Sequence, residues 1–164
     1  MNQKQYRLIT NKIREYKYGV RLARFINRFL NEIVYVAFFA LLIFMVIQKD
    51  KNIVRVVVVT GISFVLVSVV RHFINAKRPY TMYDFVPIIE KDKEGDSMPS
   101  RHVFSAFVIA MAFLYVNTCL GVFFLIIALL MAIERVIVGV HFPKDVIVGA
   151  IIGIVSGVIG FYII

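Results

Sequence analysis

From residue 33 onward, apolar residues fill the chain in long runs that polar residues interrupt at only a few places. Ile33 to Gln48 and Ile53 to Val70 form the first two runs, joined by a polar turn at residues 49–52. A membrane-crossing helix needs roughly 17–25 mostly apolar residues, so each run predicts one crossing. The second run is rich in valine, which favours strands in water. In lipid an open strand cannot satisfy its backbone, so a helix is predicted there too.

The stretch from Val103 to Ile133 carries no charge and is too long for one crossing. At about 1.5 Å per residue it would span about 46 Å, against a hydrocarbon core of about 30 Å. A break at residues 117–121 divides it into a third and a fourth helix, and Val146 to Ile164 forms the fifth. The pattern predicts an all-α integral membrane bundle of about five transmembrane helices over residues 33–164.

Residues 1–32 differ from the rest, because lysines and arginines interrupt them throughout. Between Tyr16 and Leu30, apolar residues recur at helical spacing among arginines. This pattern is typical of an amphipathic helix that lies in the membrane interface with its arginines toward the headgroups. A soluble basic arm is the alternative. We therefore divide the chain into an interfacial segment, 1–32, and a transmembrane domain, 33–164.

Composition excludes a soluble globular protein. The chain is 60% hydrophobic and 18% charged, with a mean hydropathy of +0.83, and 164 residues cannot bury that much apolar surface. In a membrane chain the net charge of +9 indicates anionic headgroups or a phosphate substrate, and no nucleic acid partner is expected. Cys119 is the one cysteine, which excludes an internal disulfide and a thiolate metal cluster.

Five crossings place the polar segments on two faces. The N-terminal segment, the connection 71–101 and the segment 134–145 share one face, whereas residues 49–52, 117–121 and the C-terminus share the other. The connection includes a charged run at residues 90–96, and loops of such length are usually functional or disordered. The first face gathers these polar residues at or near helix ends: Arg71, His72, Lys77, Arg78, Ser100, Arg101, His102, Arg135, His141 and Asp145.

This set of residues favours phosphoryl chemistry. Several guanidinium groups with one nearby carboxylate suit phosphate oxygens. Pro143 favours a helix start, which places His141 just before that helix and Asp145 within its first turn. The carboxylate can then hold one imidazole nitrogen and leave the other as a nucleophile, while His102 can protonate a leaving oxygen.

Two other readings of these residues are weaker. Ordinary positive flanks of membrane helices would explain isolated lysines, but not the histidines. A metal site would place its ligands in competition with several arginines for the same space, so no metal and no other cofactor is expected.

Three motifs in order resemble the type 2 phosphatidic acid phosphatase (PAP2) superfamily, whose pattern is K-x6-R-P, P-S-G-H and S-R-x5-H-x3-D. This sequence has Arg71 and Arg78-Pro79 with six residues between them, then Pro99-Ser100-Arg101-His102, then Glu134-Arg135 followed by His141 and Asp145 at the same spacings. The match runs from the second predicted helix to the fifth. Three motifs at helix ends on one face are far more specific than any one of them.

The resemblance implies a role for each matching residue. His141 would form a phosphohistidine, oriented by Asp145, and His102 would protonate the leaving group and activate water. Arg71, Arg78 and Arg135 would clamp the phosphoryl oxygens, helped by Ser100, and no metal is expected. Arg71 and Arg101 replace a lysine and a glycine of the pattern; the Arg101 side chain would point away or touch the substrate headgroup. Glu134 replaces a serine and is expected to pair with a neighbouring arginine.

Small size and an interfacial N-terminus resemble bacterial undecaprenyl pyrophosphate phosphatases, which implies a cytoplasmic-membrane enzyme acting on that lipid. Phosphatidylglycerophosphate or phosphatidic acid is the alternative substrate. A transporter or a non-catalytic lipid-binding subunit is the alternative class. Gly149, Gly153 and Gly157 form a strip for close helix packing, within the chain or in a homodimer.

Two indications of orientation conflict. Of the 19 lysines and arginines, 16 lie on the face of the candidate site, and the positive-inside rule would place that face in the cytoplasm. The family resemblance implies an outward-facing site that recycles carrier lipid. We favour the outward orientation, on the resemblance.

Overall fold

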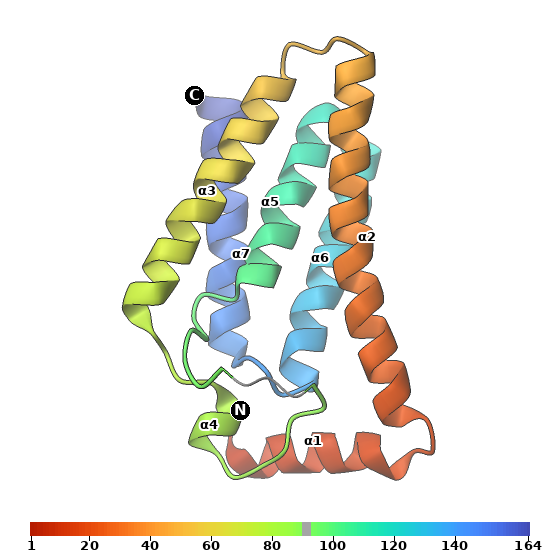
Figure 1. Cartoon of the computed structure of the whole chain (residues 1–164), viewed down its shortest axis with the longest axis vertical. Coiled ribbons are helices and arrows are strands. Elements are labelled where there is room, and N and C mark those ends of the chain that lie inside the picture. The colour runs from red at the N-terminus through yellow and green to blue at the C-terminus, as the bar shows by residue number, and fades with distance from the viewer. Residues whose placement is uncertain (90–92) are drawn as a thin grey trace.

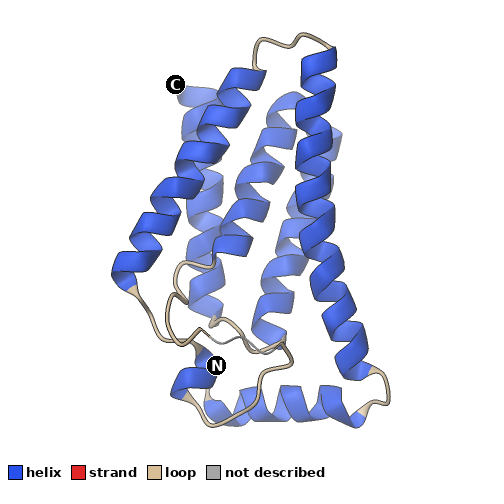
Figure 2. Ribbon diagram, viewed as in Figure 1, coloured by secondary structure: helices blue, strands red, loops and turns tan. Residues whose placement is uncertain are grey.

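Long helices standing side by side, with one short helix across their end, make up the protein in its computed structural model, which describes residues 1–89 and 93–164 (Figure 1). The helices are α1 (Gln3–Glu15), α2 (Gly19–Ile47), α3 (Ile53–Ile74), α4 (Pro79–Met82), α5 (Arg101–Val116), α6 (Thr118–Ile137), α7 (Pro143–Val158) and the short π-helix η1 (Ile159–Ile163). Among the described residues there is no strand (Figure 2).

The helices α2, α3, α5, α6 and α7 form the bundle. Within the described residues, four stretches are long and apolar enough to cross a membrane, and they correspond to α2, to α3 with α4, to α6, and to α7 with η1. The fifth bundle helix, α5, is also apolar but has only 16 residues. The prediction of an all-α membrane bundle of about five helices is confirmed.

Helix α5 forms the centre of the bundle. Every residue from Val103 to Phe113 is buried, because α3, α6 and α7 pack around this helix. The surrounding helices instead present large apolar side chains outward, such as Phe39, Phe73 and Ile151, which are 62%, 82% and 55% exposed. A helix that is apolar on all sides is stable only when it is buried, and exposed apolar faces are stable only in lipid. The bundle therefore has α5 as its core and a lipid-facing exterior.

The N-terminal helices differ from the prediction in their bounds. The first crossing helix begins at Gly19, and no break separates it from residues 33–48. Asn31 and Glu32 are polar but do not stop a helix, and Glu32 accepts a hydrogen bond from Arg28 one turn earlier at 2.6 Å. The amphipathic helix predicted between Tyr16 and Leu30 is thus the start of α2.

The helix that lies across the end of the bundle is α1, which the apolar pattern did not predict (Figure 1). Its start is fixed by a capping box. The Asn2 side chain accepts a hydrogen bond from the Gln5 amide at 3.0 Å, and the Gln5 side chain accepts one from the Asn2 amide at 2.9 Å. A sharp corner at residues 16–18 then leads into α2.

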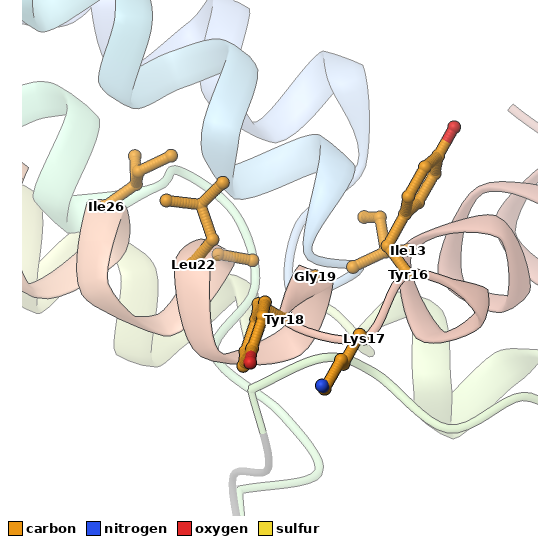
Figure 3. Close-up of a pocket in the computed structure, with 8 residues that line it drawn as sticks. Ile13, Tyr16, Lys17, Tyr18, Gly19, Leu22 and Ile26 are labelled. Atoms are coloured by element: carbon orange, nitrogen blue, oxygen red, sulfur yellow. The ribbon is translucent and has the colours of Figure 1, made fainter.

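A cavity of about 540 Å³ lies at this corner, lined mainly by apolar and aromatic side chains that include Ile13, Tyr16, Tyr18 and Leu22 (Figure 3). Lys17 also lines it, and its ammonium group lies 5.4 Å from the centre of the Tyr18 ring. Tyrosine and lysine together are typical of the headgroup level of a membrane. The corner is thus suited to the membrane interface.

The remaining connections agree with the prediction. Asn117 separates α5 from α6, and its side chain caps α6 by accepting a hydrogen bond from the Leu120 amide at 3.0 Å. The connection 71–101 contains the last turn of α3, the short α4 and a long loop. The start of its charged run, residues 90–92, lies outside the described residues. The turn between α2 and α3 lies at the opposite end of the bundle from α1 (Figure 2).

The glycine strip of α7 faces α5. A Cβ atom at Gly149 would lie 2.7 Å from the Ser100 carbonyl oxygen, and one at Gly153 would lie 2.8 Å from that of Phe104. At Gly157 it would lie 2.4 Å from the Met111 side chain. Of the two interpretations of the strip, close packing within the chain is therefore the one observed. A homodimer stays a prediction.

Candidate active site

The expected nucleophile, His141, lies in the short loop between α6 and α7 with only 1% of its surface exposed. Its backbone amide donates to the Arg135 carbonyl oxygen at 3.3 Å, and its own carbonyl oxygen accepts a hydrogen bond from the Tyr6 hydroxyl at 3.0 Å. Burial lowers the pKa of His141 to about 4; the charges of Arg78 and Arg135 act in the same direction, and Asp145 opposes them. At neutral pH the imidazole is therefore uncharged.

Asp145 lies in the first turn of α7, as Pro143 at the helix start predicts. The carboxylate is fully buried, and its Oδ2 atom accepts hydrogen bonds from the Phe142 amide at 3.0 Å and from the Ser97 hydroxyl at 2.6 Å. The same oxygen lies 3.7 Å from Nδ1 of His141. The structure thus brings the expected nucleophile and its expected orienting group together.

Three arginines expected to clamp phosphate are buried at the same end of the bundle. Arg71, Arg78 and Arg135 are 8%, 2% and 1% exposed. Each binds neutral oxygen atoms of the protein: Arg71 donates to the Pro99 carbonyl at 3.4 Å, and Arg135 donates to the Asn31 side chain at 2.7 Å. These contacts with neutral oxygen atoms leave the guanidinium charges in place, and Glu134 offsets only part of them by pairing with Arg135. The pocket therefore keeps an excess of positive charge that suits an anion.

Arg78 makes the most contacts with the backbone. Its guanidinium donates to the carbonyl oxygens of Gly95 at 3.0 Å, Val140 at 3.3 Å and Asp96 at 3.5 Å. These bonds join the long loop before α5 to the loop that carries His141. Arg78 therefore holds together two loops of the candidate site besides carrying positive charge.

The Pro99-Ser100-Arg101-His102 motif forms the start of α5. Ser100 is fully buried at the N-cap, its amide donates to the Asp145 carbonyl oxygen at 2.9 Å, and its hydroxyl has no hydrogen-bond partner among the residues described. His102 is half-buried in the first turn. A free buried hydroxyl and the first amides of a helix suit an anion.

Arg101 behaves differently from the other arginines. Its side chain is exposed, and its guanidinium lies 5.5 Å from the centre of the Phe64 ring on α3. It therefore lies on the outer rim of the site, beside a lipid-facing side chain, and is not part of the buried arginine group. Glu134 lies beside Arg135, with 3.6 Å between its Oε2 atom and Arg135 Nε, which confirms the expected pairing.

Two contributors to the site were not predicted. Ser97 bonds Asp145, and the only signal in the sequence is a hydroxyl two residues before the Pro99 motif. Tyr6 is completely buried against the rings of Tyr83, Phe85 and Phe142, and burial raises the pKa of its hydroxyl, which stays protonated and able to donate. Nothing in the basic amphipathic sequence around Tyr6 signals such a contact.

Three arginines of the N-terminal helices bind the loop after α4. Arg7 pairs with Asp84, Arg14 donates to the Pro87 carbonyl oxygen at 3.1 Å, and Arg24 donates to that of Ile88 at 3.3 Å. The loop supplies carbonyl and carboxylate oxygen atoms close to α1 and α2. The N-terminal segment thus supports the site.

The geometry of the site also bears on the metal alternative. Within residues 1–89 and 93–164, no group of three or more His, Cys, Asp or Glu side chains is arranged to hold a metal ion. His141 and Asp145 lie instead among arginines.

The fold and site together define a membrane-embedded helical protein with a buried histidine, a carboxylate and an arginine cluster at one end of the bundle. Residues 52–164 match the model of the PAP2 superfamily, and the chain belongs to that superfamily. The match includes every residue expected in the site, from Arg71 to Asp145.

Known relatives extend the similarity to almost the whole chain. The bacitracin transport permease protein BcrC of Bacillus licheniformis is 24% identical over 99% of this chain and 80% of its own length. The crystal structure of Aquifex aeolicus LpxE superposes with a TM-score of 0.75 at 28% identity, covering 97% of this chain and 93% of that chain.

A second solved structure shares the fold. It is a transmembrane PAP2-type phosphatidylglycerolphosphate phosphatase from Bacillus subtilis, with a TM-score of 0.68 at 23% identity over 96% of this chain and 83% of that chain. Since the family model begins at residue 52 and both structures cover at least 96% of this chain, the N-terminal helices α1 and α2 are part of the shared fold as well.

Proposed function

We propose that this protein hydrolyses a lipid phosphate or pyrophosphate through a phosphohistidine at His141, without a metal ion. The observation that carries the proposal is the uncharged, buried His141. Its Nδ1 faces Ser97 and Asp145, and the charges of Arg78 and Arg135 lower the pKa of its ring. A neutral imidazole has a lone pair available for attack, and the arginines supply the charge that binds the phosphoryl oxygens.

The proposed first step transfers the phosphoryl group to the enzyme. Nε2 of His141 attacks phosphorus, the bond from phosphorus to the leaving oxygen breaks, and His102 gives that oxygen a proton. Asp145 stabilises the positive charge that develops on His141, and Arg71, Arg78 and Arg135, helped by the Ser100 hydroxyl, stabilise the negative charge on the phosphoryl oxygens. The lipid product leaves.

Water completes the reaction in the second step. His102, now without its proton, takes one from a water molecule, whose oxygen attacks phosphorus. The bond between phosphorus and Nε2 breaks, and inorganic phosphate leaves. Both histidines return to their starting protonation states, so the cycle balances with water as the only co-substrate.

A lipid substrate is supported by the position of the site. The expected site residues lie at the ends of apolar helices, which is the depth of phospholipid headgroups, and Arg101 lies beside the lipid-facing Phe64 ring. Within this class we propose undecaprenyl pyrophosphate, because the exposed Arg101 adds a charge that a second phosphate group can bind. We further propose a bacterial cytoplasmic membrane location with the site facing outward.

Phosphatidylglycerophosphate, or phosphatidic acid, is the second candidate, supported by the fold shared with the Bacillus subtilis phosphatidylglycerolphosphate phosphatase. The similarity to BcrC, a bacitracin transport permease protein, instead favours transport without hydrolysis. The presence of His141, His102 and Asp145 supports hydrolysis over transport, since a transporter needs only the arginines.

The test is phosphate release by protein purified in detergent, in EDTA, from the three lipids in parallel. We expect release to be fastest from undecaprenyl pyrophosphate and absent in His141→Ala. Faster phosphate release from another lipid would change the proposed substrate and leave the proposed hydrolysis intact. Wild-type protein that binds these lipids and releases no phosphate would contradict the proposed hydrolysis.

A further inference from the structure

Ser97 lies between the proposed nucleophile and its carboxylate. The Nδ1 atom of His141 and the Oδ2 atom of Asp145 are 3.7 Å apart, which exceeds the range of about 2.7–3.2 Å for an N–H···O hydrogen bond. The Ser97 hydroxyl oxygen lies 2.6 Å from that carboxylate oxygen and 3.4 Å from His141 Nδ1. All three side chains are at most 1% exposed, so bulk water does not compete for these contacts.

The hydrogen-bond donors and acceptors of Ser97, His141 and Asp145 determine which of their atoms carry protons. An ionised carboxylate only accepts, so the Ser97 hydroxyl donates its single proton to Asp145. The hydroxyl oxygen then has only lone pairs to offer His141. The contact with Nδ1 is favourable when Nδ1 carries a proton, and Nε2 of the neutral ring is then bare. That tautomer is the one that can attack phosphorus.

Backbone contacts hold Ser97 in place. Its amide donates to the Ala76 carbonyl oxygen at 2.8 Å, and Arg78 holds the carbonyl groups of Gly95 and Asp96 just before it. Oδ1 of Asp145 has no hydrogen-bond partner within the described part of the chain, so Oδ2 carries the hydrogen bonds that the carboxylate accepts there. The hydroxyl is thus one of two donors that fix the position of this oxygen.

We propose that Ser97 is a positioning residue that couples His141 to Asp145, selecting the Nδ1-protonated tautomer of the nucleophile. Its kinetic consequences rest on the proposed function. When His141 gains positive charge during attack, Nδ1–H becomes a stronger donor, and contacts that are long in the resting enzyme shorten in the reacting complex. The negative charge of Asp145 then stabilises the imidazolium of His141 through the Ser97 hydroxyl.

The tautomer of His141 can be measured independently of enzyme activity. Protein labelled with ¹⁵N-histidine contains three histidines, and the signals of His141 are those missing from His141→Ala. We expect wild-type His141 to carry its proton on Nδ1 near neutral pH, and Ser97→Ala to shift a measurable fraction to Nε2. A wild-type Nε2–H tautomer, or identical spectra for Ser97→Ala and wild type, would overturn the proposal.

Kinetics supply the second readout. We expect Ser97→Ala to lower kcat about 10- to 100-fold, the range for a hydrogen bond to a charged group, with KM nearly unchanged. Ser97→Thr keeps the hydroxyl and should recover most of the loss. The double variant Ser97→Ala/Asp145→Asn should be about as slow as Asp145→Asn alone, because both changes break one path.

If Ser97 had only a structural role, the losses in kcat of the two single variants would multiply in the double variant. Ser97→Thr would then not recover the lost activity. That pattern, or wild-type kcat in Ser97→Ala, would contradict the coupling. Thr60→Val is the matched control, because it removes a buried hydroxyl that bonds only its own helix, at Val56. If wild-type protein released no phosphate, the proposed function would fail, and the nitrogen spectra would still decide the role of Ser97.

Discussion

The hydroxyl of Tyr6 donates a hydrogen bond at 3.0 Å to the backbone carbonyl of His141, 135 residues later in the chain. This contact joins the first helix to the loop that carries the proposed nucleophile. The Tyr6 ring stacks on Phe85 with 5.0 Å between ring centres and meets Phe142 edge-on at 6.0 Å. Helix α1 therefore supports the site from below the bundle.

Removing this support should slow the enzyme. We expect Tyr6→Phe to lose one hydrogen bond worth about 1 kcal/mol and to lower turnover several-fold. Tyr6→Ala leaves a cavity and should cost about 3–5 kcal/mol of stability. Thermal unfolding in detergent and phosphate release measure the two effects, with the exposed Tyr16→Phe as control. Wild-type stability and turnover in Tyr6→Ala would show that α1 contributes nothing to the site.

The pH profile should reflect the lowered pKa of His141. A proton on His141 removes the attacking lone pair, so activity falls as pH drops through that pKa. Because the pKa of His141 is about 4, the enzyme's own acid limb in the pH profile of kcat/KM lies well below pH 6.5, the ordinary pKa of histidine. Asp145 raises this pKa, so Asp145→Asn should move the limb to still lower pH while it lowers kcat.

Substrate ionisation provides the internal control for this profile. A phosphate monoester has its own pKa of about 6, and that limb should not move in Asp145→Asn. A single acid limb near pH 6.5 that shifts in Asp145→Asn would contradict a neutral, buried nucleophile.

Close packing of α7 on α5 should be essential for alignment of the site. In Gly149→Ala the new methyl group would lie 2.7 Å from the Ser100 carbonyl oxygen, which the backbone must relieve by moving. We expect a loss of about 1–3 kcal/mol in stability together with reduced turnover. Gly61→Ala on α3 has nothing within 4 Å of the added atom and should be neutral or slightly stabilising. Equal behaviour of the two variants would contradict the packing.

Cys119 allows the orientation to be measured. It is exposed at the start of α6, on the face opposite the site. If the site faces outward, a membrane-impermeant maleimide should label Cys119 only after the cells are permeabilised. Lys17→Cys in a Cys119→Ser background reports the face of the site and should label in intact cells. The reverse pattern would place the site in the cytoplasm, as the positive-inside rule predicts.

The sequence was most informative where physical limits are strict. A charge-free run from Val103 to Ile133 is too long for one crossing, so a break near Asn117 was predictable. The start of α7 was equally predictable, because Pro143 favours the first turn of a helix. The motifs then placed His141, Asp145 and the buried arginines at one end.

Features that depend on tertiary contacts could not be predicted from the sequence. Asn31 lies within α2, and its side chain accepts a hydrogen bond from Arg135, 104 residues away in the chain. Arg14 and Arg24 bind loop carbonyl groups that no helical pattern reveals. Ser97 reaches Asp145 only through the path of an irregular loop. Local periodicity contains none of this information.

The most direct test of the central claim is to trap the covalent intermediate. Wild-type protein is mixed with ³²P-labelled undecaprenyl pyrophosphate in EDTA, quenched in alkali, where phosphohistidine survives, and digested to locate the label. We expect label on the peptide that contains His141, none in His141→Ala, and both slower labelling and slower loss of label in His102→Ala. Label on another residue, or undiminished phosphate release by His141→Ala, would contradict the mechanism.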